Sequence, residues 1–352
     1  MRYLITLAAC CALSAGPALA ASTNFKDPID VPAAMTRLAT TTQLSAVGLA
    51  GKRLVAVGIR GLIITSDDQG TTWTQRKAPV SSDLLAVHFP SSLKGWAVGH
   101  DGVVLHSSDA GASWTRQFDG RAAATQLKAH FAQLEGQGDP NGKRLLDEMK
   151  LNYENGPEQA LLDVWFSDDS NGFVAGSFGT LLATSDGGKS WQSWIEKVDY
   201  GSLLHLNTIR GIGGELYIGS EKGIVFKLDR TRQRFAPIAT GYTGSFFTLA
   251  GQGTTIIAGG LRGSAWRSVD SGATWTKLET GLLGAVTAAE QSAAGELLLV
   301  SQGGDVLLSK DAGSSFRPQK VKRPTLFSGV AHTGAGKAVL VGLRGVQQID
   351  LK

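Results

Sequence analysis

The strongest constraint on this chain is an eight-residue pattern, Ser/Thr-x-Asp-x-Gly-x-x-aromatic, that the sequence repeats. Short Asp and Ser side chains accept hydrogen bonds from backbone N–H groups a few residues later, which closes a tight turn. Gly supplies the positive φ that such a turn needs, and the aromatic residue buries a large apolar surface as the next strand begins. Each copy therefore predicts one β-hairpin of the kind called an Asp box. We expect its aspartates to be structural, and they are Asp68, Asp109, Asp186, Asp270 and Asp311.

The spacing of the boxes predicts the architecture. Successive aspartates lie 41, 77, 84 and 41 residues apart. The 84 is two steps of about 42 residues, which places a degenerate box at Asp229, and the 77 is one step plus an insertion of about 36 residues. Within each unit, four short runs of strand-forming residues are bounded by Gly, Asp and Ser. Seven such units predict an all-β, seven-bladed β-propeller over residues 43–352.

The last unit is one strand short. Strands are predicted at 327–332, 338–343 and 345–351, and no fourth run follows them. Residues 34–40 have a strand-like pattern and belong to the polar N-terminal segment, residues 21–42. We expect them to pair beside the last strand as the outer strand of the seventh blade, because ring closure removes unpaired strand edges.

Residues 119–159 interrupt the repeat between the second and third units. Apolar residues at helical spacing, such as Leu127, Phe131 and Leu134, predict one helix, and a second helix is predicted around 145–153. The insertion joins the outermost strand of one blade to the innermost strand of the next. We therefore expect it on the same face as the turns between second and third strands, either as a surface elaboration or as a lid or knob that binds a partner.

Residues 1–20 have the composition of an export signal. Arg2 is basic, residues 4–15 are apolar, and Ala18-Leu19-Ala20 resembles a cleavage site. The apolar run is shorter than the roughly 20 residues that span a bilayer. We therefore expect an exported, periplasmic protein with no transmembrane segment after signal removal.

Several classes of site are not predicted. Cys10 and Cys11 lie in the export signal, so the exported chain would have no disulfide and no cysteine metal site. The histidines show no i, i+4 pairing, and the Gly-rich strings follow predicted turns rather than open helices, so no metal or other cofactor is expected. The formal net charge of +4, or +3 without Arg2, gives no case for nucleic acid. We expect a monomer.

One unit resembles a known family. Residues 164–168 (Val-Trp-Phe-Ser-Asp), 172–176 (Gly-Phe-Val-Ala-Gly), 179–182 (Gly-Thr-Leu-Leu) and 184–191 (Thr-Ser-Asp-Gly-Gly-Lys-Ser-Trp) are similar to the photosystem II stability/assembly factor family. The resemblance extends over residues 40–352. It implies a seven-bladed propeller exported to the periplasm or, in a phototroph, to the thylakoid lumen. It also implies a non-enzymatic, chaperone-like role in which an arginine-bearing face holds a membrane-protein subunit during assembly.

The arginine feature of that family matches three positions in this sequence. Arg60, Arg262 and Arg344 each lie in a Gly-x-Arg-Gly turn between the second and third strands of a unit. Lys222, His100 and Asp101 occupy comparable turns, so the expected rim is mixed rather than uniformly basic. Guanidinium groups gathered on one rim suit a carboxylate or phosphate. The alternative is that arginine stems cover the rim while their head groups lie in water.

The sequence also allows two functions other than that of an assembly factor. An accessory subunit of an envelope transporter or secretion system would use the same rim with another client. An Asp-box glycosidase is the enzymatic alternative, in which the three arginines would imitate the sialidase carboxylate site. However, the Phe/Tyr-Arg-Ile-Pro signature of sialidases is absent, and no motif singles out a carboxylate pair. The candidates for such a pair are Asp101, Asp163 and Glu290.

Overall fold

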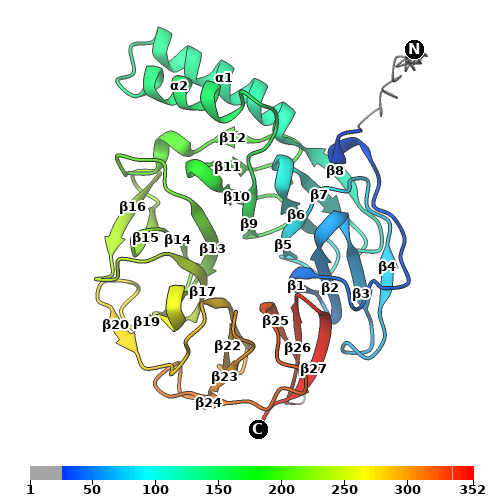
Figure 1. The fold of residues 1–352 in the computed structure, drawn as a ribbon. Helices are drawn as coiled ribbons and strands as arrows, with labels where there is room; N and C mark the ends of the chain where they lie inside the picture. Colours follow the sequence, from blue (N-terminus) through cyan, green and yellow to red (C-terminus); the bar gives the residue numbers. More distant parts are fainter. Residues whose placement is uncertain (1–25, 335) are drawn as a thin grey trace, which may run out of the picture.

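The computed structural model describes residues 26–334 and 336–352 and shows seven antiparallel sheets in a ring (Figure 1). Within each sheet the strands follow one another in chain order, and the first strand of every sheet lines the central channel. The seven-bladed propeller is therefore confirmed. The export signal predicted at residues 1–20 lies outside the described residues.

The first three blades flank the insertion. Blade 1 contains β1 (Leu44–Ala50), β2 (Arg53–Gly58), β3 (Ile63–Ser66) and β4 (Thr74–Arg76). Blade 2 contains β5 (Leu84–His88), β6 (Gly95–Gly99), β7 (Val104–Ser107) and β8 (Thr115–Phe118). Blade 3 contains β9 (Leu161–Phe166), β10 (Gly172–Gly176), β11 (Leu181–Thr184) and β12 (Gln192–Ser193).

The remaining blades follow without interruption. Blade 4 contains β13 (Leu206–Ile212), β14 (Glu215–Ser220), β15 (Ile224–Asp229) and β16 (Arg234–Ala239). Blade 5 contains β17 (Phe246–Gln252), β18 (Thr255–Gly260), β19 (Ala265–Ser268) and β20 (Thr276–Leu278). Blade 6 contains β21 (Val286–Gln291), β22 (Leu297–Ser301), β23 (Val306–Ser309) and β24 (Arg317–Pro318). Blade 7 contains β25 (Phe327–Gly334), β26 (Lys337–Gly342) and β27 (Gly345–Asp350).

The core lies in layers between neighbouring blades. The second strands, such as β6 and β22, are buried along their whole length because both of their faces meet protein. This explains why the sequences of these strands are continuous runs of apolar residues. Between blades 2 and 3, Trp96 of β6 stacks on Phe166 of β9 with ring centroids 3.6 Å apart and planes 7° from parallel.

The five Asp boxes share one hydrogen-bond network. In the first, Ser66 Oγ donates to Asp68 Oδ1 (2.8 Å) and accepts from Gly70 N (2.8 Å). Asp68 also accepts from the backbone N and the hydroxyl of Thr72, at 2.8 and 2.6 Å, and the Trp73 indole donates to Gly70 O (3.0 Å). The carboxylate network recurs at Asp109, Asp186, Asp270 and Asp311. The same carboxylate contacts therefore close the turn of all five hairpins.

The degenerate box predicted at Asp229 is a different turn. Asp229 Oδ1 accepts from Thr231 N (2.9 Å) and Arg232 N (3.0 Å), two and three residues later. In the boxes the carboxylate accepts from the fourth residue instead. The repeat interval therefore predicted the position of the turn between β15 and β16 correctly, but it did not predict the hydrogen bonds within that turn.

The predicted closing strand is wrong. The seventh sheet contains β25, β26 and β27, and residues 34–40 form coil and a turn. The N-terminal segment is held along blade 1, where the Gln75 side chain in β4 accepts a hydrogen bond from Thr36 N (2.8 Å). It also meets blade 7, where Thr40 O accepts a hydrogen bond from Val346 N (3.0 Å) and Ala39 is buried in a cluster with Val341.

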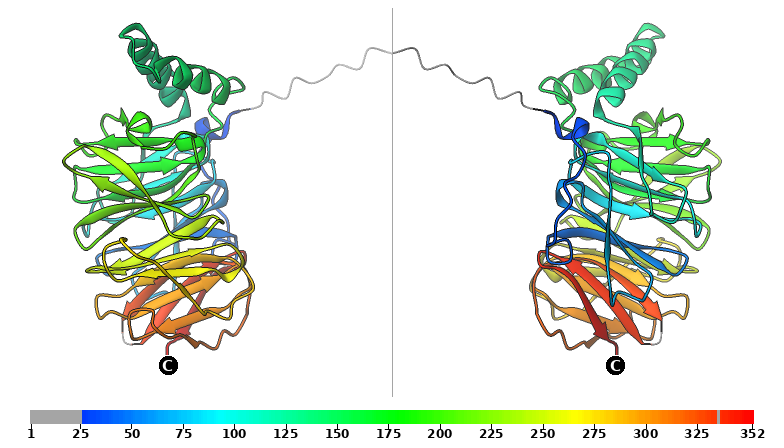
Figure 2. Two further views of the ribbon diagram at one scale, coloured as in Figure 1. Left: turned by 90° about the vertical axis from the view of Figure 1, so that its left-hand side faces the viewer. Right: turned by 90° about the vertical axis from the view of Figure 1, so that its right-hand side faces the viewer.

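The insertion folds into the two predicted helices, α1 (Gly120–Gly136) and α2 (Gly142–Asn152). In the side views they stand at one edge of the ring (Figure 2). Leu127, Phe131, Leu145 and Met149 are buried in the same cluster as Trp191 of blade 3. The helices are therefore packed on the propeller and extend its core.

The box carboxyls make stability depend on acid pH. Hydrogen bonds, led by the Thr or Ser hydroxyl four residues later, lower the pKa of Asp68, Asp186, Asp270 and Asp311 from 3.8 to about 2. The folded state therefore binds these protons more weakly than the unfolded state. The stability that they supply is present above about pH 4 and is lost as the pH falls toward 2.

We expect the urea midpoint of unfolding to fall steeply between about pH 4 and about pH 2, the interval between the unfolded and folded pKa values of the box carboxyls. In the Asp311→Asn variant one of these groups no longer titrates, so the fall should be shallower. Equilibrium unfolding at several pH values measures both slopes. Identical pH dependence of the variant and the wild type would contradict this explanation.

Candidate partner-binding face

One end of every blade carries the turn between its second and third strands. In blade 1, Leu44 at the start of β1 pairs with Gly58 at the end of β2. This turn and the connection from β4 to β5 therefore lie at one end of the sheet, and the Asp box lies at the other. The other blades have the same register. We call the ring surface formed by these turns and connections the turn face.

Five of these turns hold a non-glycine residue in the left-handed conformation. The central residues are Arg60 (φ 55°), Asp101 (φ 60°), Phe178 (φ 51°), Lys222 (φ 56°) and Arg262 (φ 54°). The three cationic side chains are exposed. The backbone of the turn is thus the same around the ring while the side chain at its tip changes.

Arg344 reaches the same face from another kind of turn. Gly342 pairs with Gly345, so a two-residue hairpin presents Arg344, which is exposed. Blade 7 adjoins blade 1, whose turn carries Arg60. Arg262 belongs to blade 5, and the intervening blade 6 carries Asp305 at its turn. The structure therefore places the three predicted arginines on one face, two of them on neighbouring blades, without a continuous arginine patch.

These arginines lack the carboxylate partner that several other arginines have. Within the described part of the chain, Arg60, Arg262 and Arg344 form no ion pair. Arg53 and Arg121, by contrast, each lie 2.6–2.7 Å from an aspartate carboxylate. The three turn arginines are therefore available to an external anion.

His100 lies on the turn face next to the insertion. Its turn places Asp101, not His100, at the central left-handed position, and Asp101 Oδ2 accepts a hydrogen bond from Ser82 Oγ (2.6 Å). The next residue, Gly102, lies against Gly120 at the start of α1, where an added Cβ would come within 2.8 Å of the backbone. His100 is exposed beside this contact.

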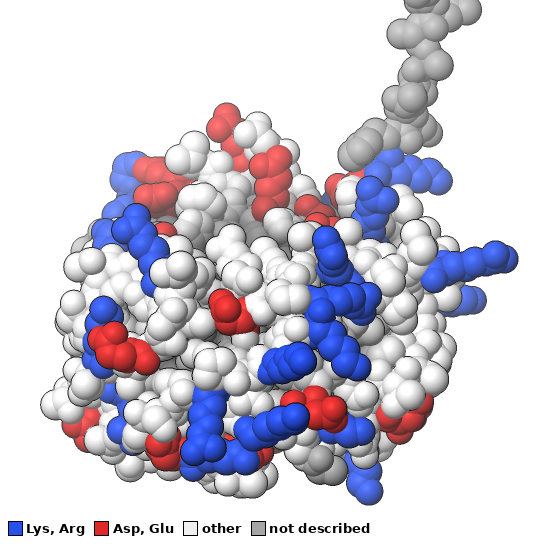
Figure 3. All heavy atoms as spheres, turned by 60° about the horizontal axis from the view of Figure 1, so that its bottom comes forward, with Lys and Arg blue, Asp and Glu red and all other residues white. Residues whose placement is uncertain are grey.

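Sequence reasoning missed a second group of cations on the turn face. Lys320, Lys322 and Arg323 lie on the connection from β24 to β25, and all three are exposed. The sequence could have indicated this group, because residues 312–349 contain no Asp or Glu to neutralise its charge. Figure 3 shows Lys and Arg side chains gathered right of centre on the side of the molecule that it draws.

Two of the carboxylates considered for a glycosidase line the central channel, a hollow of about 360 Å³. Asp163 pairs with Arg210 and accepts from Ile209 N (2.8 Å), which joins blades 3 and 4. Glu290 accepts from the backbone N and Nδ1 of His332 at 2.6 and 2.9 Å, which joins blades 6 and 7. Each carboxylate thus has a structural partner on the next blade.

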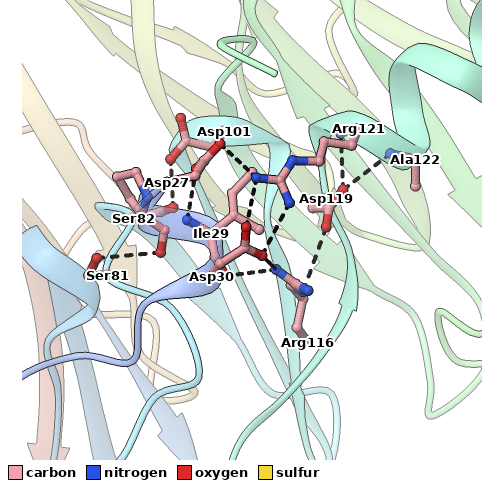
Figure 4. Close-up of polar contacts among 11 residues, drawn as sticks. Asp27, Ile29, Asp30, Ser81, Ser82, Asp101, Arg116, Asp119, Arg121 and Ala122 are labelled. Carbon is pink, nitrogen blue, oxygen red and sulfur yellow. Dashed lines mark hydrogen bonds and ion pairs between the residues drawn. The ribbon is translucent and has the colours of Figure 1, made fainter. Parts of the chain in front are cut away.

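The insertion is fixed to the N-terminal segment by charge (Figure 4). Arg121 of α1 lies 2.7 Å from Asp27 and 2.9 Å from Asp30, and its hydrogen bond lowers the pKa of Asp30. Arg116 contacts Asp30 (3.4 Å) and Asp119 (3.6 Å). Asp119 in turn caps α1 by accepting from the backbone N–H groups that begin the helix. One cluster therefore orients the hairpin and the start of the described chain together.

Within residues 26–334 and 336–352, no group of three or more His, Cys, Asp or Glu side chains is placed to hold a metal ion. None of the helices described there combines the length and the apolar character needed to cross a bilayer.

Comparison with known proteins gives a family and a fold. A family model described as "Photosynthesis system II assembly factor YCF48" matches residues 36–121 and 145–325. A solved structure described as "YCF48 bound to D1 peptide" is 18% identical, with a TM-score of 0.64 over 92% of this chain and 99% of that one. YCF48 from Cyanidioschyzon merolae is 17% identical, with a TM-score of 0.60 over 89% and 96% of the two chains. No curated protein matches.

The charged cluster at α1 predicts a local effect of mutation. In Arg121→Ala, amide hydrogen exchange should rise in residues 27–36, because their ion pairs to the helix are lost. The global thermal midpoint should change little, since exposed ion pairs add little to stability. Exchange mass spectrometry measures both regions, with Arg144→Ala on α2 as the matched control. Unchanged exchange at residues 27–36 would show that the cluster does not hold the segment.

Proposed function

Since this chain belongs to the photosystem II assembly factor YCF48 family, we propose that it is a non-enzymatic scaffold that holds a membrane-protein subunit during assembly. The turn face binds a carboxylate-bearing segment of that subunit through Arg60, Arg262 and Arg344. Lys222 and His100 extend the contact to the neighbouring blades. The solved relative named as bound to D1 peptide supports a peptide segment of a membrane protein as the class of ligand.

The observation that carries this proposal is the exposure of three arginines on one face without an ion-pair partner in the described residues. A guanidinium group presents a planar fork of N–H donors that fits a carboxylate with two parallel hydrogen bonds. Neighbouring guanidinium groups repel one another. An anionic ligand that binds between Arg60 and Arg344 would remove this repulsion.

The turn backbone fixes the positions from which two of these arginines project. Arg60 and Arg262 have left-handed φ values, which cost a non-glycine residue about 1–2 kcal/mol. The same conformation occurs at Asp101 and Phe178, so the turn tolerates different side chains at its tip. A long cationic side chain at the tip of a rigid turn is, however, well placed to contact a partner.

The proposal includes export of the protein across a membrane. The composition of residues 1–20 supports delivery to the periplasm, or to the thylakoid lumen in a phototroph. There the exported propeller would meet the membrane-protein segments that project from the bilayer.

The test is capture of membrane proteins from the host by the wild type and by Arg60→Asp/Arg262→Asp/Arg344→Glu. Asp101 has the same left-handed conformation, so aspartate fits the turns at positions 60 and 262. We expect captured client to fall at least tenfold, because each lost charged hydrogen bond is worth about 1.5–3 kcal/mol. Mass spectrometry identifies the client and separates an assembly intermediate from a transporter or secretion complex.

The matched control is Lys52→Glu/Lys189→Glu. These exposed lysines lie on the β1–β2 turn and in the third Asp box, at the opposite end of the blades. This control should capture the client like the wild type. Equal capture by the triple variant would refute binding by the turn face.

A further inference from the structure

The outer edge of β27 is open to pairing. Val346 N donates to Thr40 O (3.0 Å), and Leu351 N donates to Gly336 O on the side of β26 (2.7 Å). Backbone groups alternate in direction along an antiparallel strand. The N–H and C=O groups of Gln348 and Asp350 therefore point away from β26, as Val346 does. No described strand pairs with this edge. In Figure 1, β27 is the outermost arrow of its blade.

A hollow of about 580 Å³ straddles this edge. On the side of blade 1 it is lined by Thr40 and Trp73, and on the side of blade 6 by Lys322 and Arg323. Gln348 lies between the two sides. In the other six blades the fourth strand pairs with the corresponding edge of the third strand.

Neighbouring segments approach the edge without pairing to it. Residues 319–323 contact β27 through side chains, with Arg323 N donating to Gln347 Oε1 (3.2 Å). The other polar atom of this side chain, Gln347 Nε2, is buried without a hydrogen-bond partner in the described residues. From the other side, the N-terminal segment offers the single carbonyl of Thr40. Hydrogen-bonding capacity therefore remains along the hollow.

We propose that an extended acidic peptide binds here as the fourth strand of blade 7. Backbone hydrogen bonds to Gln348 and Asp350 would supply affinity, as in other cases of strand addition to a sheet edge. Alternate side chains of an added strand point to opposite sides. Carboxylates would therefore face Lys322 and Arg323, and small or apolar side chains would face Trp73. The inference rests on the proposed function only in taking the peptide from the same client.

Charge favours such a peptide over a second copy of this chain. Residues 312–349 contain no carboxylate, and Asp350 at the end of β27 is the first that follows them. Lys322 and Arg323 form no ion pair within the described residues. Pairing two β27 edges would bring these cations together with those of the other copy. An acidic strand would neutralise them.

The direct test is fluorescence anisotropy with a labelled eight-residue peptide of alternating threonine and glutamate, using the chain from residue 21 onward. We expect saturable binding that protects the amides of residues 345–351 from hydrogen exchange. A peptide N-methylated at the residues that face the edge should bind at least tenfold more weakly, because two or three backbone hydrogen bonds are lost. An alternating threonine–lysine peptide should also bind at least tenfold more weakly.

Matched variants locate the site on the protein. Gln348→Pro removes the outward N–H and should weaken binding at least tenfold, whereas Gln348→Thr keeps the N–H and should bind nearly as the wild type does. Lys322→Glu/Arg323→Glu should abolish the preference for glutamate over lysine. The N-methylated peptide keeps the test decisive even where Gln348→Pro disturbs folding, because that change lies on the ligand.

Two results would overturn the inference. One is equal affinity for the N-methylated and unmodified peptides. The other is a dimer that Gln348→Pro converts to a monomer, since β27 would then pair with a second copy. The triple arginine variant separates this inference from the proposed function. In this variant the acidic peptide should still bind while client capture falls. If instead the wild type captures the client but does not bind the peptide, only the proposal of an added fourth strand is refuted.

Discussion

The hydrogen bond from the box hydroxyl to the box carboxylate is the contact on which the rest of the structure depends. Ser66 Oγ and Asp68 Oδ1 are 2.8 Å apart and belong to residues two positions apart, so this bond closes a very short loop. It fixes the turn that delivers Trp73 to the layer between blades. A single hairpin cannot bury both of its faces, but hairpins repeated at a regular interval can do so by stacking around a ring.

This arrangement separates stability from recognition. The boxes lie at one end of the blades, and the turns at the other end keep one backbone while their central side chain changes from Arg60 to Asp101 to Phe178. Because the scaffold fixes the position of each tip, a change of side chain alters charge or shape without altering the fold. Such a face can acquire specificity for a client one residue at a time.

Local features of this chain were predictable, and features set by distant residues were not. The boxes, the number of blades and the two helices follow from residues close together in sequence, as does the placement of the three arginines on one face. The prediction of a closing strand was wrong because long-range contacts place the N-terminal segment elsewhere. Thr36 bonds to Gln75, 39 positions away, and Asp27 bonds to Arg121, 94 positions away. The pattern of residues 34–40 contains no information about these partners.

The carboxylates of the channel illustrate the same limit. Asp163 and Glu290 could be considered for catalysis as long as their partners were unknown. Those partners, Arg210 and His332, lie on the next blade, 47 and 42 residues away. A local sequence pattern does not predict contacts between side chains on different blades. Their geometry follows from the ring, and only after the ring is known do these carboxylates become structural.

The open edge of blade 7 follows from the course of the N-terminal segment. Its early contacts with α1 and β4 carry it along blade 1, and the backbone hydrogen bond described between it and β27 is the one at Thr40. An exposed edge invites aggregation unless charge or cover limits which strands can pair with it. Lys322 and Arg323 supply that charge, and Gly345 packs so closely under Thr40 that a Cβ would lie 1.9 Å from its carbonyl oxygen. The features that protect the edge from indiscriminate pairing thus also define the one kind of strand, extended and acidic, that it would accept.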